Sequence, residues 1–248
     1  MPVAAVLRRA GQDLLNLVFP PHCAICRQAG APLCDACLQR FPRVEPPLCR
    51  SCGKPTAGAP ICQSCQQTPL TIDGIRSAVL LEGGAREAVH QLKYNGCSSL
   101  AAPLGRVMAD HWSMHPLPAG VLVAVPLHIA RQRERGYNQA HLLSLEFGRL
   151  VGLPAMDGTL KRARNTRAQV GLDASERHAN VRDAFAYRAP RHGGGVDGQR
   201  VLLVDDVCTT GATLEACSVV LKAAGAASVW GYTLARAAQS SCIVVTDT

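Results

Sequence analysis

Two adjacent aspartates and a threonine-rich turn are the residues in this chain whose types and spacing most clearly suggest chemistry. Asp205 and Asp206 directly follow the apolar run 201–204, and the turn Thr209-Thr210-Gly211 precedes a segment with helical spacing, 212–224. A helix that begins after such a turn offers unpaired N–H groups and the positive end of its dipole to an anion. Paired carboxylates beside it can accept hydrogen bonds from sugar hydroxyls or hold Mg²⁺. The pattern therefore predicts a sugar-phosphate site at the carboxyl end of a buried strand; the alternative is a surface turn whose acids merely cap the helix.

Eight of the twelve cysteines form a second group with chemical potential, because they occur as four C-x-x-C pairs. Seven, eleven and nine residues separate successive pairs. Each pair can place two sulfur atoms on one tetrahedral ion, so four pairs satisfy two structural zinc sites. Sequential pairing is the simplest arrangement, and interleaved pairing stays open. The predicted ligands are Cys23, Cys26, Cys34, Cys37, Cys49, Cys52, Cys62 and Cys65.

Composition favours a globular protein that works in a reducing compartment. The chain has 248 residues, 48% of them hydrophobic, and a formal net charge of +8. The charge is not segregated, since residues 1–70 carry 7 − 3 = +4 and the remainder carries 19 − 15 = +4. The segment 1–19 is interrupted by polar residues and reads as an amphipathic helix rather than a signal peptide. Close cysteine pairs without an export signal indicate the cytoplasm.

Hydrophobic periodicity predicts an α/β fold in which strands and helices alternate after residue 70. Three parts are expected: an N-terminal helix at 1–20, a cysteine-rich module at 21–69 and an α/β domain at 70–248. Lys93 ends one expected helix, where a solvated lysine is commoner than a phosphate ligand, and His111 is expected at the surface. Strands are expected at 77–81, 121–125, 184–187, 201–204, 228–234 and 242–245, and helices at 85–94, 100–112 and from the 131–139 cluster through 150.

A second anion site is predicted where the expected strand 121–125 ends. Pro126-Leu127-His128 follows it and leads into a basic cluster that includes Arg135, which could bind phosphate through two parallel hydrogen bonds. A solvated basic helix start is an equally good reading of the spacing. The later segment 160–180 is expected to be a long basic loop that closes over a polyanion. Its clustered cations are Lys161, Arg162, Arg164 and Arg167.

Taken in order, these motifs resemble the ComF family of competence-associated proteins. The resemblance covers nearly the whole chain, and its most specific parts are Arg135-Gly-Tyr-Asn-Gln-Ala140 and Val204-Asp-Asp-Val-Cys-Thr-Thr-Gly-Ala-Thr213. It implies a double zinc ribbon followed by a type I phosphoribosyltransferase fold, a parallel sheet flanked by helices.

The resemblance also implies roles for individual residues. Asp205 and Asp206 would hold the ribose hydroxyls of phosphoribosyl pyrophosphate, Leu127-His128 would bind its pyrophosphate, and residues 161–169 would form the mobile loop. Arg135, Arg162 and Arg164 are the expected cations for the leaving group, and Mg²⁺ would accompany the substrate. The 5′-phosphate would be cradled by Cys208, Thr209, Thr210, Gly211, Ala212 and Thr213.

Three function classes follow from these observations. The first is a Mg²⁺-dependent phosphoribosyltransferase or a close derivative, for which no acceptor base or specificity hood is recognisable. The second is a sensor that binds phosphoribosyl pyrophosphate without transfer. The third is a competence factor that associates with single-stranded DNA or with a protein of the competence machinery. An aromatic content of 4% argues against a base-stacking platform for a DNA strand.

Overall fold

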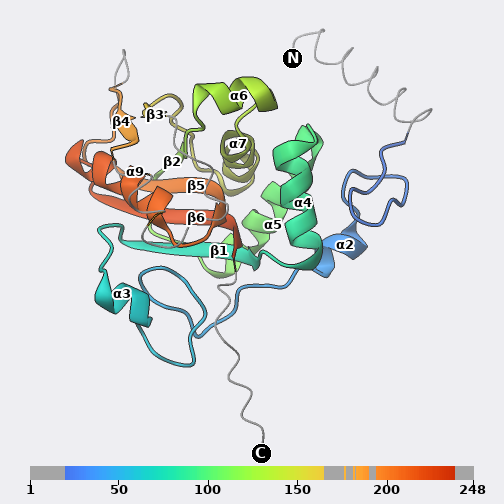
Figure 1. Cartoon of the computed structure of the whole chain (residues 1–248), viewed down its shortest axis with the longest axis horizontal. Coiled ribbons are helices and arrows are strands. Elements are labelled where there is room, and N and C mark those ends of the chain that lie inside the picture. Colours follow the sequence, from blue (N-terminus) through green and yellow to red (C-terminus); the bar gives the residue numbers. More distant parts are fainter. Residues whose placement is uncertain (1–19, 165–175, 177–180, 182, 190–193, 238–248) are drawn as a thin grey trace, which may run out of the picture.

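The computed structural model describes residues 20–164, 176, 181, 183–189 and 194–237. The expected N-terminal helix, the strand at 242–245, and Arg167 with most of the basic loop lie outside this range. Within it, four parallel strands form one sheet in the order β1-β6-β5-β2 (Figure 1). The strands are β1 (Gly74–Leu80), β6 (Ser228–Arg236), β5 (Arg200–Cys208) and β2 (Val121–Ala124).

Both faces of this sheet are covered, which explains why its strands are apolar runs rather than alternating patterns. On one face, Leu104, Met108 and Phe147 pack in one core with Val204 and Leu234. On the other face, Leu214 and Leu221 pack with Leu203 and Val229. The helices of the first face are α4 (Gly83–Tyr94), α5 (Ala101–Met114) and α7 (Gln139–Val151), and α9 (Ala212–Ala223) covers the second (Figure 1).

The prediction of a parallel α/β sheet flanked by helices is confirmed. The central strand runs further than its apolar core 201–204, because β6 continues to pair with it as far as the Cys208–Arg236 register. The two aspartates therefore lie on a strand rather than on a loop. A rigid strand fixes their direction more tightly than a loop would.

Three expectations are wrong in detail. Residues 160–162 do not begin a loop but form β3 (Leu160–Arg162), which pairs antiparallel with β4 (Phe185–Tyr187). The basic cluster is not the start of one helix but a separate one, α6 (Ile129–Arg135). Gly136, with φ of 84°, ends it, and the Asn138 side chain then caps α7 by accepting from the Ala140 N–H.

The third wrong expectation concerns His111, which is buried in the core instead of lying at the surface. Its Nδ1 lies 3.0 Å from Tyr232 Oη, and that hydroxyl donates to the Met108 carbonyl at 2.7 Å, so Nδ1 must be the donor. Burial, with His115 nearby, lowers the pKa of His111 to about 4. The side chain is thus a neutral part of the core, satisfied by a tyrosine that is distant in sequence.

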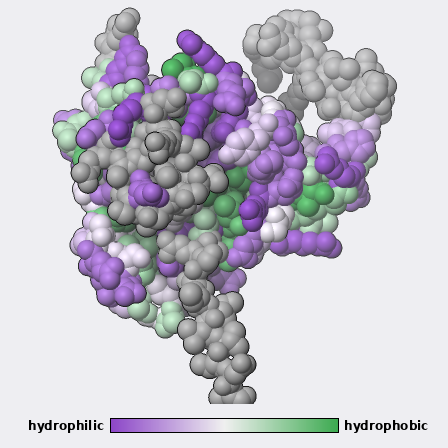
Figure 2. All heavy atoms as spheres, viewed as in Figure 1, coloured by the Kyte–Doolittle hydropathy of each residue, from purple (hydrophilic) through white to green (hydrophobic). Residues whose placement is uncertain are grey.

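The cysteine-rich module lies along one side of the sheet domain. It contains the short helices α2 (Asp35–Gln39) and α3 (Gln63–Gln67), and η1 (Ser98–Leu100) precedes α5. The described surface in Figure 2 is largely hydrophilic, with hydrophobic residues in small patches. Among the described helices, none is both long and apolar enough to cross a bilayer.

Candidate functional site

The two aspartates form a buried acid pair at the carboxyl end of β5. Asp205 is 9% exposed and Asp206 is 3% exposed. Asp205 Oδ1 accepts a hydrogen bond from the Asp206 N–H at 2.8 Å, and Lys93 Nζ lies 3.0 Å from Asp206 Oδ2. Burial and the charge of Asp206 raise the pKa of Asp205 to about 8, although Lys93 opposes the rise. Asp205 is therefore largely protonated near neutral pH.

Lys93 pairs with the acids, although sequence reasoning left it out of the site. It projects from the last turn of α4, and its side chain is 22% exposed. Burial lowers the pKa of its ammonium, but the attraction of Asp206 and Asp205 outweighs burial and raises it. The available signal was Lys93-Tyr94-Asn95-Gly96 at a helix end, which fits an exposed lysine equally well.

The acid pair opens into a cavity of about 160 Å³ between the ends of β5 and β2. Several predicted residues meet there, from segments far apart in sequence. Lys93, Tyr94, Arg131 and Asn138 also line it and were not predicted to be part of it. The predicted residues on its wall are Leu127, Arg135, Arg162, Asp205, Asp206 and Thr213.

The cations of this cavity are held by neighbouring side chains. Arg135 Nη1 donates to Gln139 Oε1, and its Cζ lies 5.4 Å from the centre of the Tyr94 ring. Arg162 Cζ lies 5.4 Å from the centre of the Phe185 ring. Burial, and then the charge of Arg131, lowers the pKa of Arg162. An arginine keeps its proton under such a shift, so the wall presents guanidinium groups opposite the acid pair.

Three other predicted residues contribute less directly. The His128 ring accepts from the Ala130 N–H at 3.3 Å, so this ring nitrogen caps α6. Lys161 and Arg164 are exposed on and just after β3. In the described part of the chain, none of the three lines the cavity.

The threonine-rich turn continues from β5 into α9. Gly211, with φ of 89°, caps the helix, and a Cβ there would lie 2.8 Å from Ile75 Cδ1. Only glycine fits this position without strain, because it combines a left-handed backbone with a close neighbour. Thr210 Oγ1 accepts from the Ala212 N–H at 3.4 Å. Thr209 and Thr210 stay partly exposed, whereas the Cys208 side chain is buried.

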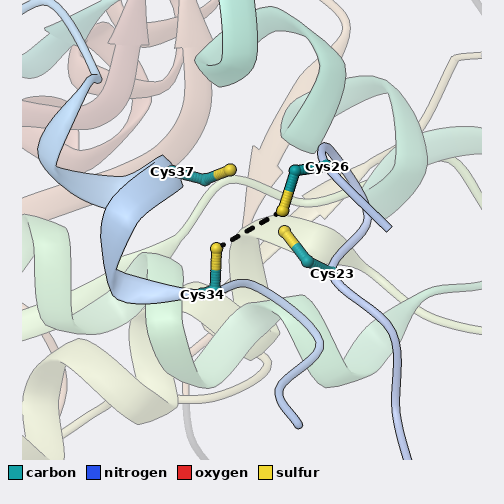
Figure 3. A group of neighbouring side chains, drawn as sticks. All are labelled: Cys23, Cys26, Cys34 and Cys37. Carbon is teal, nitrogen blue, oxygen red and sulfur yellow. Dashed lines mark hydrogen bonds between the residues drawn. The ribbon is translucent and has the colours of Figure 1, made fainter. Parts of the chain in front are cut away.

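The eight paired cysteines gather into two tetrads. Tetrad 1 comprises Cys23, Cys26, Cys34 and Cys37 (Figure 3), and tetrad 2 comprises Cys49, Cys52, Cys62 and Cys65. All four sulfur atoms of each tetrad lie within 4.8 Å of one another. The sequential pairing is therefore the one that the fold adopts.

The geometry of both tetrads suits a tetrahedral zinc ion. Zn–S bonds of about 2.3 Å place tetrahedral sulfur atoms about 3.8 Å apart. The Cys26–Cys34 sulfur pair is separated by 3.6 Å (Figure 3), and the Cys52–Cys62 pair by 3.7 Å. With a complete set of four thiolates, each tetrad fits structural zinc and leaves no coordination position for a substrate.

Comparison with known proteins identifies a known domain in the cysteine-rich part of the chain and another in the sheet domain. A double zinc ribbon domain matches residues 14–66, and a phosphoribosyl transferase domain matches residues 147–242. The DNA utilization protein YhgH of Salmonella typhimurium is 32% identical over 230 residues, which cover 89% of this chain and 99% of that protein. The chain belongs to the ComF family. Competence protein F of Haemophilus influenzae is 40% identical over 116 residues, 47% of this chain and 50% of its own length. Competence protein ComFC of Bacillus subtilis is 27% identical over 212 residues, 82% of this chain and 84% of its own length.

The two matched domains do not cover the cavity evenly. Every tetrad cysteine lies inside the zinc-ribbon match, and the acid pair lies inside the phosphoribosyl transferase match. Lys93, Leu127 and Arg135 precede residue 147 and lie in neither. Much of the wall that faces the acids in this ComF protein is therefore built from sequence between the two domain models, whereas Arg162 lies inside the second match.

Proposed function

We propose that this ComF protein binds phosphoribosyl pyrophosphate with Mg²⁺ in the cavity at the acid pair, and transfers the phosphoribosyl group to an acceptor. One observation carries the proposal: two buried carboxylates and the cations Lys93, Arg135 and Arg162 line the same small cavity at the ends of neighbouring parallel strands. Ligands of open α/β sheets bind at such strand ends. The phosphoribosyl transferase domain match supports the same assignment.

Each part of the substrate has a counterpart in this arrangement. Asp205 and Asp206 accept the hydrogen bonds of the ribose hydroxyls, and the turn 209–213 receives the 5′-phosphate at the start of α9. The segment Leu127-His128 and Arg135 receive the pyrophosphate, and a Mg²⁺ ion bound with the substrate would neutralise part of its charge. We also propose that the protein works in the cytoplasm. This applies to both of its parts, the cysteine-rich module at residues 21–69 and the sheet domain at residues 70–248.

The proposed reaction is substitution at the anomeric carbon. The acceptor forms a bond to that carbon while the bond to pyrophosphate oxygen breaks, and the leaving group departs with both electrons. Positive charge develops on the ribose, and negative charge on the pyrophosphate. Arg135 and Arg162 stabilise the departing charge, and the buried acids hold the sugar still.

Calorimetric titration with phosphoribosyl pyrophosphate and Mg²⁺ tests the binding half. Asp205→Asn combined with Asp206→Asn should abolish binding while the zinc content and the unfolding transition persist. Asp110→Asn is the matched control, because Asp110 is an exposed carboxyl that lines a separate hollow beside α2. Unchanged affinity in the double variant would return the acid pair to a structural role.

Turnover is tested separately by pyrophosphate release. The purified chain is incubated with the donor, Mg²⁺ and a panel of nucleobases, amines and nucleotides. Release that depends on one acceptor establishes transfer. Tight donor binding without release across the panel would instead favour a sensor that reports the level of phosphoribosyl pyrophosphate.

A second candidate function is association with single-stranded DNA, and the names of the relatives favour it. Proteins named for competence and for DNA utilization align with most of this chain. Fluorescence anisotropy of a labelled oligonucleotide measures such binding, which should weaken steeply as salt rises because phosphate contacts release counterions. An unchanged anisotropy at low salt would remove this candidate and leave the donor site standing.

A further inference from the structure

A buried arginine connects tetrad 2 to the start of the threonine-rich turn. Arg236 is the last residue of β6 and is 3% exposed. Its Nη1 donates to the carbonyl oxygen of Cys52 at 2.6 Å and to Sγ of Cys208 at 2.9 Å. Cys52 belongs to tetrad 2, and Cys208 directly precedes the turn 209–211. One guanidinium nitrogen, which carries two hydrogens, thus reaches both.

The charge of Arg236 calls for a counter-charge, and tetrad 2 provides one. In the part of the chain that the structure describes, no carboxylate forms an ion pair with Arg236. A buried guanidinium without an anion is costly. Four thiolates around one Zn²⁺ carry 2 − 4 = −2 charges, so a zinc-loaded tetrad 2 is the anion that Arg236 faces.

A second contact runs in parallel through Ile75. Its N–H donates to the Ser51 carbonyl at 2.8 Å, inside the first C-x-x-C pair, or knuckle, of tetrad 2 (Cys49 to Cys52). Its own carbonyl oxygen lies 2.2 Å from the position that a Cβ on Gly53 would occupy. At its other end, Cδ1 lies 2.8 Å from where a Cβ on Gly211 would be. Ile75 is therefore packed between the knuckle and the turn.

We propose that Arg236 is a positioning residue that couples the zinc site of tetrad 2 to the phosphate turn. It balances the charge of the loaded tetrad and holds Cys208, so that zinc at tetrad 2 and an anion at the turn stabilise each other. The coupling is reciprocal, as any linkage between two binding sites must be. The part that concerns phosphoribosyl pyrophosphate rests on the proposed function, whereas the part that concerns zinc does not.

Zinc release alone tests the first half. A chromogenic chelator follows release from Arg236→Met in a Cys26→Ser/Cys37→Ser background, where tetrad 2 is the remaining four-cysteine site. Loss of such an outer contact lowers metal affinity by about 10- to 100-fold, so release should be faster by a similar factor. The matched control is Arg43→Met, since Arg43 is a half-buried arginine whose described contacts do not include tetrad 2. Equal zinc retention in Arg236→Met and its parent would overturn the proposal.

Donor-dependent protection tests the second half. Phosphoribosyl pyrophosphate with Mg²⁺ should slow zinc release from tetrad 2 about five-fold or more, the lower range of typical coupling between sites, and leave tetrad 1 unaffected. Cys208→Ala should keep the zinc but lose the protection, because Arg236 then no longer holds the turn. Arg236→Lys keeps the charge, but its ammonium ends one bond short of the Nη1 position, so it should retain zinc better than Arg236→Met while also losing protection.

The outcomes separate this inference from the proposed function. If calorimetry finds no binding of phosphoribosyl pyrophosphate, the proposed function fails, and inorganic phosphate then serves as the probe of the turn. If the donor binds and yet zinc release from tetrad 2 is unchanged, the coupling is refuted and the proposed function survives. If Arg236→Met does not fold, Cys208→Ala and Arg236→Lys still decide the matter.

Discussion

The two tetrads have the same ligands and nearly the same first knuckle, but they are packed against different parts of the molecule. In both knuckles the residue after the second cysteine has a left-handed backbone, with φ of 66° at Arg27 and 69° at Gly53. Both residues donate their N–H to the first cysteine carbonyl at 2.9 Å. The two knuckles therefore share one backbone conformation, and packing decides which residue can occupy it.

The surroundings also differ in what they position. Tetrad 1 lies near the start of α4, where a Cβ on Gly84 would touch Ile25 at 3.0 Å and Phe41 at 3.3 Å. Tetrad 2 lies against the ends of β1 and β6 and, through Arg236, against the start of the threonine-rich turn. The far end of α4 carries Lys93, which pairs with Asp206. Each tetrad thus lies beside one element that reaches the candidate site.

The largest predicted difference comes from removing one ligand of each tetrad. Cys34→Ser and Cys65→Ser should each lower the zinc content from two ions to one by elemental analysis. Because structural zinc contributes on the order of 10 kcal/mol to folding of small modules, the affected ribbon should lose its order in both variants. Cys65→Ser should also abolish donor binding in calorimetry, whereas Cys34→Ser should weaken it only modestly.

An equal loss of donor binding in the two variants would contradict this contrast. It would mean that either ribbon supports the whole sheet domain, and that proximity to the turn has no special weight. Zinc content is the control, because a variant that loses both ions reports general unfolding rather than the role of one tetrad.

How much of this could be predicted from the sequence depends on the range of the contact. The sequence predicts the acid pair, the four C-x-x-C knuckles and most strands, because a few consecutive residues define each of them. Arg236 was not singled out, since its partner Cys52 lies 184 residues away along the chain. Lys93 was judged more often solvated for the same reason, because only the folded sheet brings Asp206 to it.

The wrong expectations have a related cause. His111 was expected at the surface because nothing local shows that Tyr232 supplies a hydrogen bond in the core. The segment 160–162 was expected to be a loop because its charges favour solvent, yet β4 pairs with it and the Phe185 ring contacts Arg162. In both places a distant partner outweighed the local preference.

Gly53→Ala should destabilise the protein by roughly 2–5 kcal/mol. A left-handed conformation costs a non-glycine residue roughly 1–2 kcal/mol, and forced overpacking adds about 1–3 kcal/mol. Here the new Cβ would stand 2.2 Å from the Ile75 carbonyl oxygen. Chemical denaturation at saturating zinc measures the change. Gly198→Ala is the matched control, because Gly198 has nearly the same φ, at 67°, but nothing lies within 4 Å of its Cβ position.

Arg27→Gly makes the opposite exchange in tetrad 1 and should change stability by less than about 1 kcal/mol. Glycine relieves the left-handed strain at Arg27 but loses more backbone entropy on folding, so the two effects nearly cancel. The same denaturation assay applies. A loss as large as that of Gly53→Ala would show that Arg27 makes an energetically important contact. It would also show that the first knuckle of tetrad 1 is as tightly packed as that of tetrad 2.

The smallest effect concerns pH, and it joins the two regions at the Lys93–Asp206 pair. The folded protein holds a proton on Asp205 up to about pH 8, whereas the unfolded chain loses it near 3.8. The stabilising contribution of this proton is therefore complete below pH 4 and falls as pH rises toward 8. Between pH 6 and pH 8 the melting temperature of the zinc-loaded protein should decrease, and Asp205→Asn should flatten that slope. Lys93→Met removes the cation that opposes the raised pKa of Asp205, so the decrease should continue above pH 8. A slope unchanged by both variants would show that Asp205 does not titrate in this range and that Lys93, at the end of the helix that begins near tetrad 1, does not tune it.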